Sequence, residues 1–131
     1  MNKVAKLVII DNDDKYLLMY RNGHPTFGND PDLPGGTLED GELPHETMIR
    51  EVYEEVGIVI GEAETRQIYE GTGYSVHKTN YSLYITKFDN RPSITMSEEH
   101  LSYEWLGLEE FLEKAKSAND TYMHMVYDIL K

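Results

Sequence analysis

The chain contains no cysteine, which excludes disulfide bonds and thiolate metal ligands and is typical of a reducing compartment. No stretch approaches the ~18 consecutive apolar residues that a membrane span needs, so no membrane association is predicted. The first apolar run ends at Asp11 and is shorter than the apolar region of a secretory signal peptide. Together these absences predict a cytoplasmic protein.

Basic residues are also scarce, with 12 lysines and arginines against 24 aspartates and glutamates and a net charge of −12. Such a surface repels the phosphate backbone, which argues against a nucleic acid polymer as partner. A small phosphorylated ligand is compatible with this charge only if cations or a few local basic groups offset the repulsion. Most of the negative charge is typical of a soluble surface, so function must depend on where particular charges are placed.

The composition is that of a folded protein, with 40% hydrophobic and 11% aromatic residues. At 131 residues the chain suits one domain, so residues 1–131 are predicted to form a single unit. The segment 21–32 is rich in Gly, Pro, Asn and Asp and predicts a loop, followed by a tight bend at 33–36. Extended segments are expected at 4–10, 15–21, 37–38, 58–60, 64–72, 79–88 and 102–106, and helices at 43–56, 107–115 and 121–130. This order predicts the α+β class.

The helix expected at 43–56 has clear ends and one apolar face. Pro44 suits the first helical position, where its missing N–H costs nothing. Met48, Val52 and Val56 follow at i, i+4 and i+8 and form an apolar stripe. Gly57 suits the left-handed position that terminates a helix.

Three glutamates on this helix lie close together, because residues three and four apart are neighbours on a helix surface. Glu51 and Glu55 are like charges at i, i+4, and Glu54 and Glu55 lie in the last turn, where the helix dipole disfavours anions. One interpretation is an ordinary solvated helix face, with Arg50 paired to Glu54. The other is a divalent cation, since hard ions such as Mg²⁺ take oxygen ligands from carboxylates, water and phosphates.

The stretch from Gly36 to Ile58, GTLEDGELPHETMIREVYEEVGI, resembles the Nudix box, G-x5-E-x7-R-E-U-x-E-E-x-G-U, where U is a bulky aliphatic residue. A chance match to its seven fixed letters at a given position has a probability on the order of 10⁻⁸. The chain is therefore similar to the MutT-like Nudix hydrolases. The matching positions are Gly36, Glu42, Arg50, Glu51, Val52, Glu54, Glu55, Gly57 and Ile58.

This resemblance implies the Nudix fold, an α/β/α sandwich around a mixed sheet, and a hydrolase of phosphoric anhydride bonds that uses Mg²⁺ or Mn²⁺. Its substrate would be a nucleoside diphosphate linked to another group. The implied metal ligands are the Gly36 carbonyl and the carboxylates of Glu51, Glu54 and Glu55. The resemblance also implies that Arg50 orients a box glutamate during catalysis, and that Glu42 is an accessory carboxylate at the edge of the metal site. Glu55 is expected to be exposed.

The box leaves the general base open, and in this family the base often comes from a later loop. Residues 97–100, Ser-Glu-Glu-His, offer Glu99 as the first candidate, then Glu98 and His100, with a box glutamate as the alternative. These side chains could equally be plain surface charges. Of the box glutamates, Glu54 is the one predicted to be catalytic as well as a metal ligand. Arg21, at the end of the second expected strand, is a candidate ligand for a substrate phosphate, with an ordinary surface arginine as the alternative.

The substrate stays open between nucleoside triphosphates, including oxidised ones, dinucleoside polyphosphates and nucleotide sugars. Tyr74 lies 16 residues after Ile58, where the resemblance associates a tyrosine with dinucleoside polyphosphates. Residues 73–76 contain no proline, which disfavours ADP-ribose. A non-catalytic nucleotide-sensing domain on the same fold is the alternative function, although no catalytic letter of the box is missing. A structural α+β domain with an acidic helix face is the third reading, and fold analogy allows a homodimer.

Overall fold

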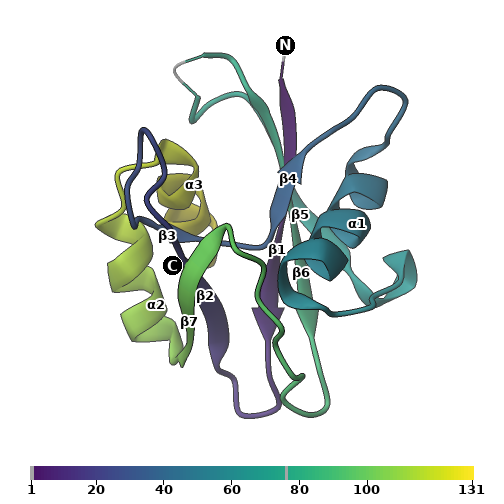
Figure 1. Ribbon diagram of the computed structural model, residues 1–131, viewed down its shortest axis with the longest axis vertical. Helices are drawn as coiled ribbons and strands as arrows, with labels where there is room; N and C mark the ends of the chain where they lie inside the picture. Colours follow the sequence, from purple (N-terminus) through teal and green to yellow (C-terminus); the bar gives the residue numbers. More distant parts are fainter. Residues whose placement is uncertain (1, 76) are drawn as a thin grey trace.

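The computed structural model describes residues 2–75 and 77–131 (Figure 1). Met1 and Val76 lie outside this part, so the proline-free segment 73–76 is described only in part. The elements are β1 (Lys3–Ile10), β2 (Tyr16–Arg21), β3 (Pro31–Asp32), β4 (Gly35–Thr37), α1 (Pro44–Val56), the 3₁₀ turn η1 (Glu62–Glu64), β5 (Arg66–Gly71), β6 (Asn80–Lys87), β7 (His100–Leu106), α2 (Leu108–Lys116) and α3 (Thr121–Leu130).

One part of the sheet is built around β1. This strand runs parallel to β6 over its whole length, from the pair Lys3–Asn80 to the pair Ile10–Lys87. β5 continues the sheet antiparallel to β6, and β4 pairs antiparallel with the first half of β1. Parallel neighbours need a long connection between them, and here that connection carries the Nudix-box segment.

The other part of the sheet is built around β2, which pairs antiparallel with β7 and β3. β1 and β2 are joined by a turn, yet they pair only at Ile10 and Tyr16, beside that turn. Beyond this pair the two strands diverge, so that the start of β1 and the end of β2 are separated. We call the space between them the wedge, and it holds the candidate site.

The sheet is covered on both faces, with α1 on one side and α2 and α3 on the other (Figure 1). Because side chains alternate along a strand, Leu7 and Ile9 of β1 pack toward α1, whereas Val8 and Ile10 pack toward α2 and α3. Each fully buried side chain of this kind stabilises the fold by about 1.5–3 kcal/mol. The predicted α/β/α sandwich around a mixed sheet is confirmed.

The ends of α1 agree with the prediction. The carboxylate of Glu46 accepts the backbone N–H of Leu43 at 2.8 Å, ahead of Pro44 at the first helical position. Gly57 ends the helix in the left-handed conformation, with φ of +75°. Gly35 has a different constraint: an added Cβ would lie 2.1 Å from the Ala5 carbonyl oxygen. Glycine is therefore needed where β4 approaches β1.

Some boundaries were predicted wrongly. Residues 58–60, expected to be extended, are not part of a strand in the described chain, although Ile58 and Ile60 are buried against α1. Hydrophobic alternation placed these side chains correctly, but the segment has no strand partner. The expected loop and bend contain β3 and β4, because β2 and β1 each offer a free edge there. β7 begins at His100, two residues before the prediction.

Within the described residues, no helix is both long and apolar enough to cross a membrane. The cytoplasmic location and the homodimer stay predictions.

Candidate active site

The three box glutamates differ sharply in exposure. Glu55 is only 4% exposed, the Glu51 side chain is 18% exposed, and that of Glu54 is 54% exposed. The expectation that Glu55 is exposed is therefore wrong. Glu51 and Glu55 lie four residues apart and share the side of α1 that faces β4, whereas Glu54 is turned away toward solvent. Helical spacing correctly predicted that the three lie close together, but it did not predict that Glu51 and Glu55 face inward and Glu54 outward.

Arg50 joins the carboxylates of the box into one cluster, which we call the Arg50 cluster: Arg50, Glu42, Glu51 and Glu54. The guanidinium donates from Nε to Glu42 Oε2 at 2.8 Å and from Nη1 to Glu51 Oε1 at 2.9 Å. Its Nη1 lies 3.3 Å from Glu54 Oε2. The Arg50 hydrogen bond, with further bonds from the Glu39 N–H and the Thr47 hydroxyl, lowers the pKa of Glu42 to about 2. Arg50 thus contacts all three neighbouring glutamates.

Glu55 points inward, to the wedge. Its Oε1 accepts the Gly35 N–H at 3.4 Å, while Oε2 is buried without a hydrogen-bond partner among the described residues. The nearest cationic candidate, His100 Nδ1, lies 3.8 Å from Oε2 and is also buried without a partner there. Burial raises the pKa of Glu55 well above its ordinary value, and the charge of Lys6 only partly offsets this.

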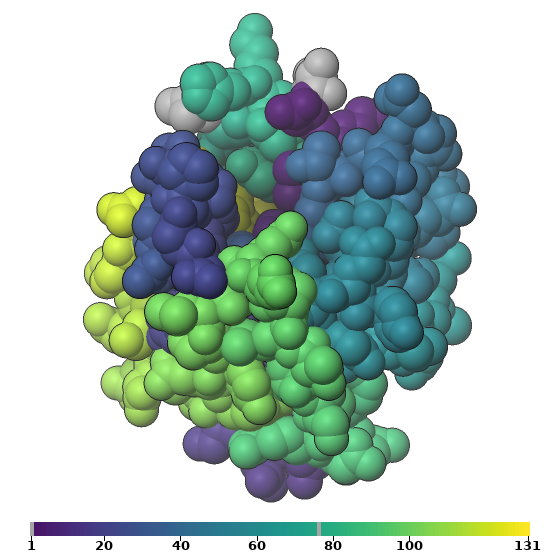
Figure 2. Space-filling model, viewed as in Figure 1, coloured from purple at the N-terminus to yellow at the C-terminus, as the bar shows by residue number. Residues whose placement is uncertain are grey.

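A cavity of about 420 Å³ fills the wedge between the diverging strands. Figure 2 shows it as a hollow between the dark-blue loop after β2 and the green segment that leads into β7. Its lining carries charged side chains of both signs. The lining residues are Lys6, Arg21, Asn22, Gly23, His24, Pro25, Asp32, Gly35, Glu55, Glu99 and His100.

Asp32 is the centre of a buried ionic group beside this cavity, the Asp32 cluster: Asp32, Lys6, Arg21, His100 and Tyr122. Lys6 Nζ donates to Asp32 Oδ1 at 3.0 Å, and His100 Nε2 lies 3.0 Å from Oδ2. The Tyr122 hydroxyl donates to Oδ1 as well, and Arg21 Nη2 lies 3.5 Å away.

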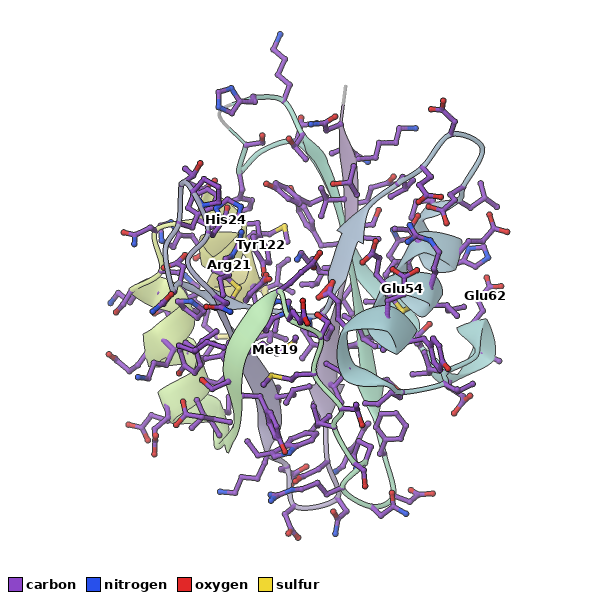
Figure 3. The ribbon with its side chains drawn as sticks, in the orientation of Figure 1. Met19, Arg21, His24, Glu54, Glu62 and Tyr122 are labelled. Carbon is purple, nitrogen blue, oxygen red and sulfur yellow. The ribbon has the colours of Figure 1, made fainter. Side chains whose placement is uncertain are left out.

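Burial alone raises the pKa of Asp32, but Lys6, His100, Arg21 and Tyr122 together hold it well below its ordinary value. Asp32 therefore carries a fixed negative charge. Figure 3 labels Arg21, which lines one cavity with His24 and another with Tyr122, and Glu54 apart from them on α1.

The segment before β7 is fixed to the end of α1 by backbone hydrogen bonds. The N–H groups of Thr95 and Ser97 donate to the carbonyls of Val56 and Glu55 at 2.9 and 3.0 Å. The Asn22 N–H donates to the Glu99 carbonyl at 3.2 Å, which connects the same segment to the loop after β2. Helix ends leave carbonyls without intrahelical partners, and satisfying them here brings residues 97–100 to the wedge.

The structure brings some predicted site residues together and leaves others apart. Glu99 and Arg21 line the same cavity as Glu55, and the buried His100 lies between Glu55 and Asp32. The Arg21 side chain is only 13% exposed, so the alternative of an ordinary surface arginine is wrong. Glu98 is exposed and does not line the cavity.

Tyr74 also lies elsewhere. Its hydroxyl donates to Asp128 of α3 at 2.6 Å, and it borders a separate hollow with Thr121 and His124.

Sequence reasoning missed Lys6, Asp32 and Tyr122. Lys6 did leave a signal, because it interrupts the otherwise apolar run Val4–Ile10 of a buried strand, and buried lysines are rare unless paired. Asp32 lies in a loop-like segment with other acidic residues, so nothing local distinguishes it. Tyr122 is one of ten tyrosines, and only the packing of α3 brings it to Asp32.

The side chains around Gly36 fit a hard divalent cation in kind. Glu51 packs directly on Gly36, where an added Cβ would lie 2.6 Å from the Glu51 carboxyl carbon. Glu55 adds a buried oxygen without a partner. Carboxylate and carbonyl oxygens are the ligands that Mg²⁺ and Mn²⁺ take. In the described chain, no three acidic or imidazole side chains already form a ligand cluster, and Arg50 instead contacts Glu51 and Glu54.

Comparison with known proteins agrees with this geometry. The model of the NUDIX domain matches residues 1–126, and the chain belongs to the Nudix family. An ADP-ribose pyrophosphatase from Methanocaldococcus jannaschii is 43% identical over 51 residues, 39% of this chain and 30% of that protein. The mouse asymmetrical bis(5′-nucleosyl)-tetraphosphatase is 36% identical over 90 residues, 63% of this chain and 59% of that protein.

The matched region thus spans less than two thirds of either relative. A crystal structure of a Deinococcus radiodurans protein superposes with a TM-score of 0.79 at 19% identity, covering 98% of this chain and 83% of that one. At this level of identity the likeness shows the fold, and it confirms the α+β Nudix fold.

Proposed function

We propose that the protein is a divalent-metal-dependent pyrophosphohydrolase that cleaves a nucleoside diphosphate linked to another moiety. The observation that carries this proposal is the complete Nudix box, folded so that Glu55 lines a cavity that Lys6 and Arg21 also line. The matching relatives support it, since both are named as enzymes that hydrolyse nucleotide phosphoric anhydrides.

The chain's own residues would divide the work. The Gly36 carbonyl and the carboxylates of Glu51, Glu54 and Glu55 would hold Mg²⁺ or Mn²⁺. Bound there, the metal would neutralise charge on the phosphates and lower the pKa of the attacking water.

Arg50, which now contacts Glu51 and Glu54, would set the orientation of these carboxylates as they gather. Arg21 would bind a substrate phosphate.

Glu99 is the proposed general base. It is exposed at the cavity and its backbone is fixed to Asn22, so its carboxylate can reach a water inside without being desolvated. A base must come within hydrogen-bond distance of the proton that it removes. Glu98 lies outside the cavity and His100 is engaged with Asp32, which ranks both behind Glu99; a box glutamate is the remaining alternative.

A phosphate-release screen with Mg²⁺ and with Mn²⁺ tests the function. The substrates are nucleoside triphosphates including an oxidised one, dinucleoside polyphosphates, ADP-ribose and nucleotide sugars. We expect turnover of at least one of these that disappears with EDTA and in Glu99→Gln falls by about 10²-fold or more. Nucleotide binding without turnover would instead support a nucleotide-sensing domain. Neither turnover nor any effect of the cations on melting would support a structural domain.

A further inference from the structure

Lys6 occupies a buried position where an apolar side chain would be less costly in free energy than a lysine. It lies in the middle of β1, on the face that carries Val8 and Ile10, and is only 8% exposed. Burying an ammonium is unfavourable unless it is paired and hydrogen-bonded, and replacing buried ion pairs by apolar residues is often neutral or stabilising. Fold stability therefore does not explain a lysine at this position.

The hydrogen bonds of Lys6 leave part of its capacity unused. Nζ donates to Asp32 Oδ1 at 3.0 Å and to the Leu33 carbonyl at 3.2 Å, whereas an ammonium has three N–H donors. Arg21 is similar, because Nη2 donates to Asp120 at 2.8 Å, whereas a guanidinium has five N–H donors. Both side chains line the wedge cavity. Two cations with spare donors thus border one cavity.

Asp32 fixes the positions of these two cations. It contacts both Lys6 and Arg21 and is itself fixed by His100, Tyr122 and the Leu33 N–H. The arrangement keeps the two side chains at the cavity instead of letting them extend to solvent. In a chain with a net charge of −12, the result is a pair of cations in a cavity that Glu55 and Glu99 also line.

We infer that Lys6 and Arg21 form a clamp for a substrate phosphate beyond the two that the metal would neutralise, and that the cavity selects substrates with three or more consecutive phosphates. This inference rests on the proposed function. Divalent cations at the box can neutralise two neighbouring phosphates, as in ADP-ribose or a nucleotide sugar. A third phosphate adds charge that Lys6 and Arg21, the lysine and arginine of the cavity lining, can offset, and charge-assisted hydrogen bonds to phosphate are among the strongest in proteins.

Isothermal titration calorimetry with inorganic tripolyphosphate and with pyrophosphate, both in Mg²⁺, tests the clamp. We expect Lys6→Met to weaken tripolyphosphate binding by about 10-fold or more and pyrophosphate binding by about 3-fold or less. Lys87→Met is the matched control, because Lys87 is exposed, pairs with Asp14 and lies outside this cavity. It makes the same change in net charge and should leave both affinities unchanged.

A purely structural role of Lys6 predicts a different result. Loss of a counter-ion of Asp32 would distort the cavity and weaken both ligands equally, and equal losses would overturn the inference. So would unchanged binding of tripolyphosphate by folded Lys6→Met. If that variant does not fold, the double variant K6M/D32N removes both members of the pair, and the same difference between the two ligands is expected.

Failure of the clamp and failure of the hydrolase are distinguishable because binding needs no turnover. Selective loss of tripolyphosphate in a protein that hydrolyses nothing would leave the clamp standing and reject the hydrolase. Turnover with ADP-ribose preferred over every triphosphate, and with kcat/KM unchanged in Lys6→Met, would reject the clamp alone.

Discussion

Two ionic clusters lie near the candidate site, and their compositions are opposite: one is centred on a cation and the other on a carboxylate. In the Arg50 cluster one cation contacts the three carboxylates of Glu42, Glu51 and Glu54, with Glu39 farther away at 3.8 Å, and the Arg50 side chain is 28% exposed. In the Asp32 cluster one carboxylate contacts two cations, an imidazole and a phenol, and the Asp32 side chain is 7% exposed. The first is open to solvent and the second is not.

This difference in exposure decides what each cluster can do. Near the surface, water screens charges and can replace a lost partner, so single contacts contribute little to stability. Under the proposed function, the carboxylates there would exchange Arg50 for a metal at low cost. In the interior, removing one partner leaves an uncompensated charge, so the Asp32 cluster is held in one geometry. Asp32, Lys6, Arg21 and His100 of the buried cluster line the wedge cavity, whereas no member of the Arg50 cluster does.

The largest effect is expected at Glu55, which lies between the two clusters. Glu55→Gln removes a proposed metal ligand and should lower kcat by about 10³-fold, or about 4 kcal/mol of transition-state stabilisation. The melting temperature should stay equal or rise, because a neutral amide replaces a carboxylate whose charged form is disfavoured by burial. Glu62→Gln, at an exposed glutamate paired with His45, is the control and should keep full activity. A kcat within threefold of the parent in Glu55→Gln would remove Glu55 from the metal site.

The next largest effect is a difference between the two clusters in their contribution to the free energy of unfolding. Asp32→Ala leaves Lys6 and Arg21 buried with fewer acceptors, and we expect a loss of about 3–5 kcal/mol in the free energy of unfolding. Glu42→Ala removes the carboxylate that Arg50 holds most closely, and should cost much less because water reaches that site. Urea denaturation of both variants measures the two losses. Equal losses would show that exposure does not separate the clusters.

Asp32 should also determine part of the acid stability. Its pKa is lower in the folded chain than the ordinary value of about 3.9 for an unfolded aspartate. The unfolded chain therefore takes up this proton first. The contribution of Asp32 is present above about pH 4 and is lost as the pH falls further. Asp32→Asn has no titrating carboxyl group at this position, so its stability cannot show this loss.

Urea unfolding at pH 6, 5, 4 and 3 measures the difference in stability between the parent and Asp32→Asn. We expect the difference to be constant at the upper values and to narrow below about pH 4. Asp11, whose pKa is also lowered, is common to both chains and cancels. A difference that stays constant to pH 3 would contradict the depressed pKa.

The surface cluster and the helix that carries it could be predicted from the sequence, because their determinants are local. Pro44, the apolar stripe and Gly57 define α1, and the spacing of the glutamates is the Nudix box itself. The fold class followed from the same motif. The buried cluster could not be predicted in this way, because its members come from β1, β2, β3, β7 and α3.

What brings these members together is the divergence of β1 from β2 after a single pair. No residue pattern indicates where the two strands of this hairpin separate, since both strands are apolar on both faces. Lys6 alone could have been found, as the one charge within a buried apolar run. The exposure of Glu55 was predicted wrongly for a related reason: its environment depends on the segment before β7, which is 40 residues or more further along the chain.

The smallest effect is expected at Tyr74, a predicted substrate-binding residue that belongs to neither cluster. Its hydroxyl is held by Asp128 and it borders a different hollow from the wedge. Tyr74→Phe keeps the ring and removes only that hydrogen bond, so kcat/KM for a dinucleoside polyphosphate and for a nucleoside triphosphate should each change by less than about threefold. Tyr53→Phe, at an exposed tyrosine of α1, is the matched control. A loss above tenfold confined to dinucleoside polyphosphates would mean that Tyr74 leaves Asp128 to bind the second nucleoside. The substrate would then extend past the wedge toward α3, and the cavity between the two clusters would hold its phosphates alone.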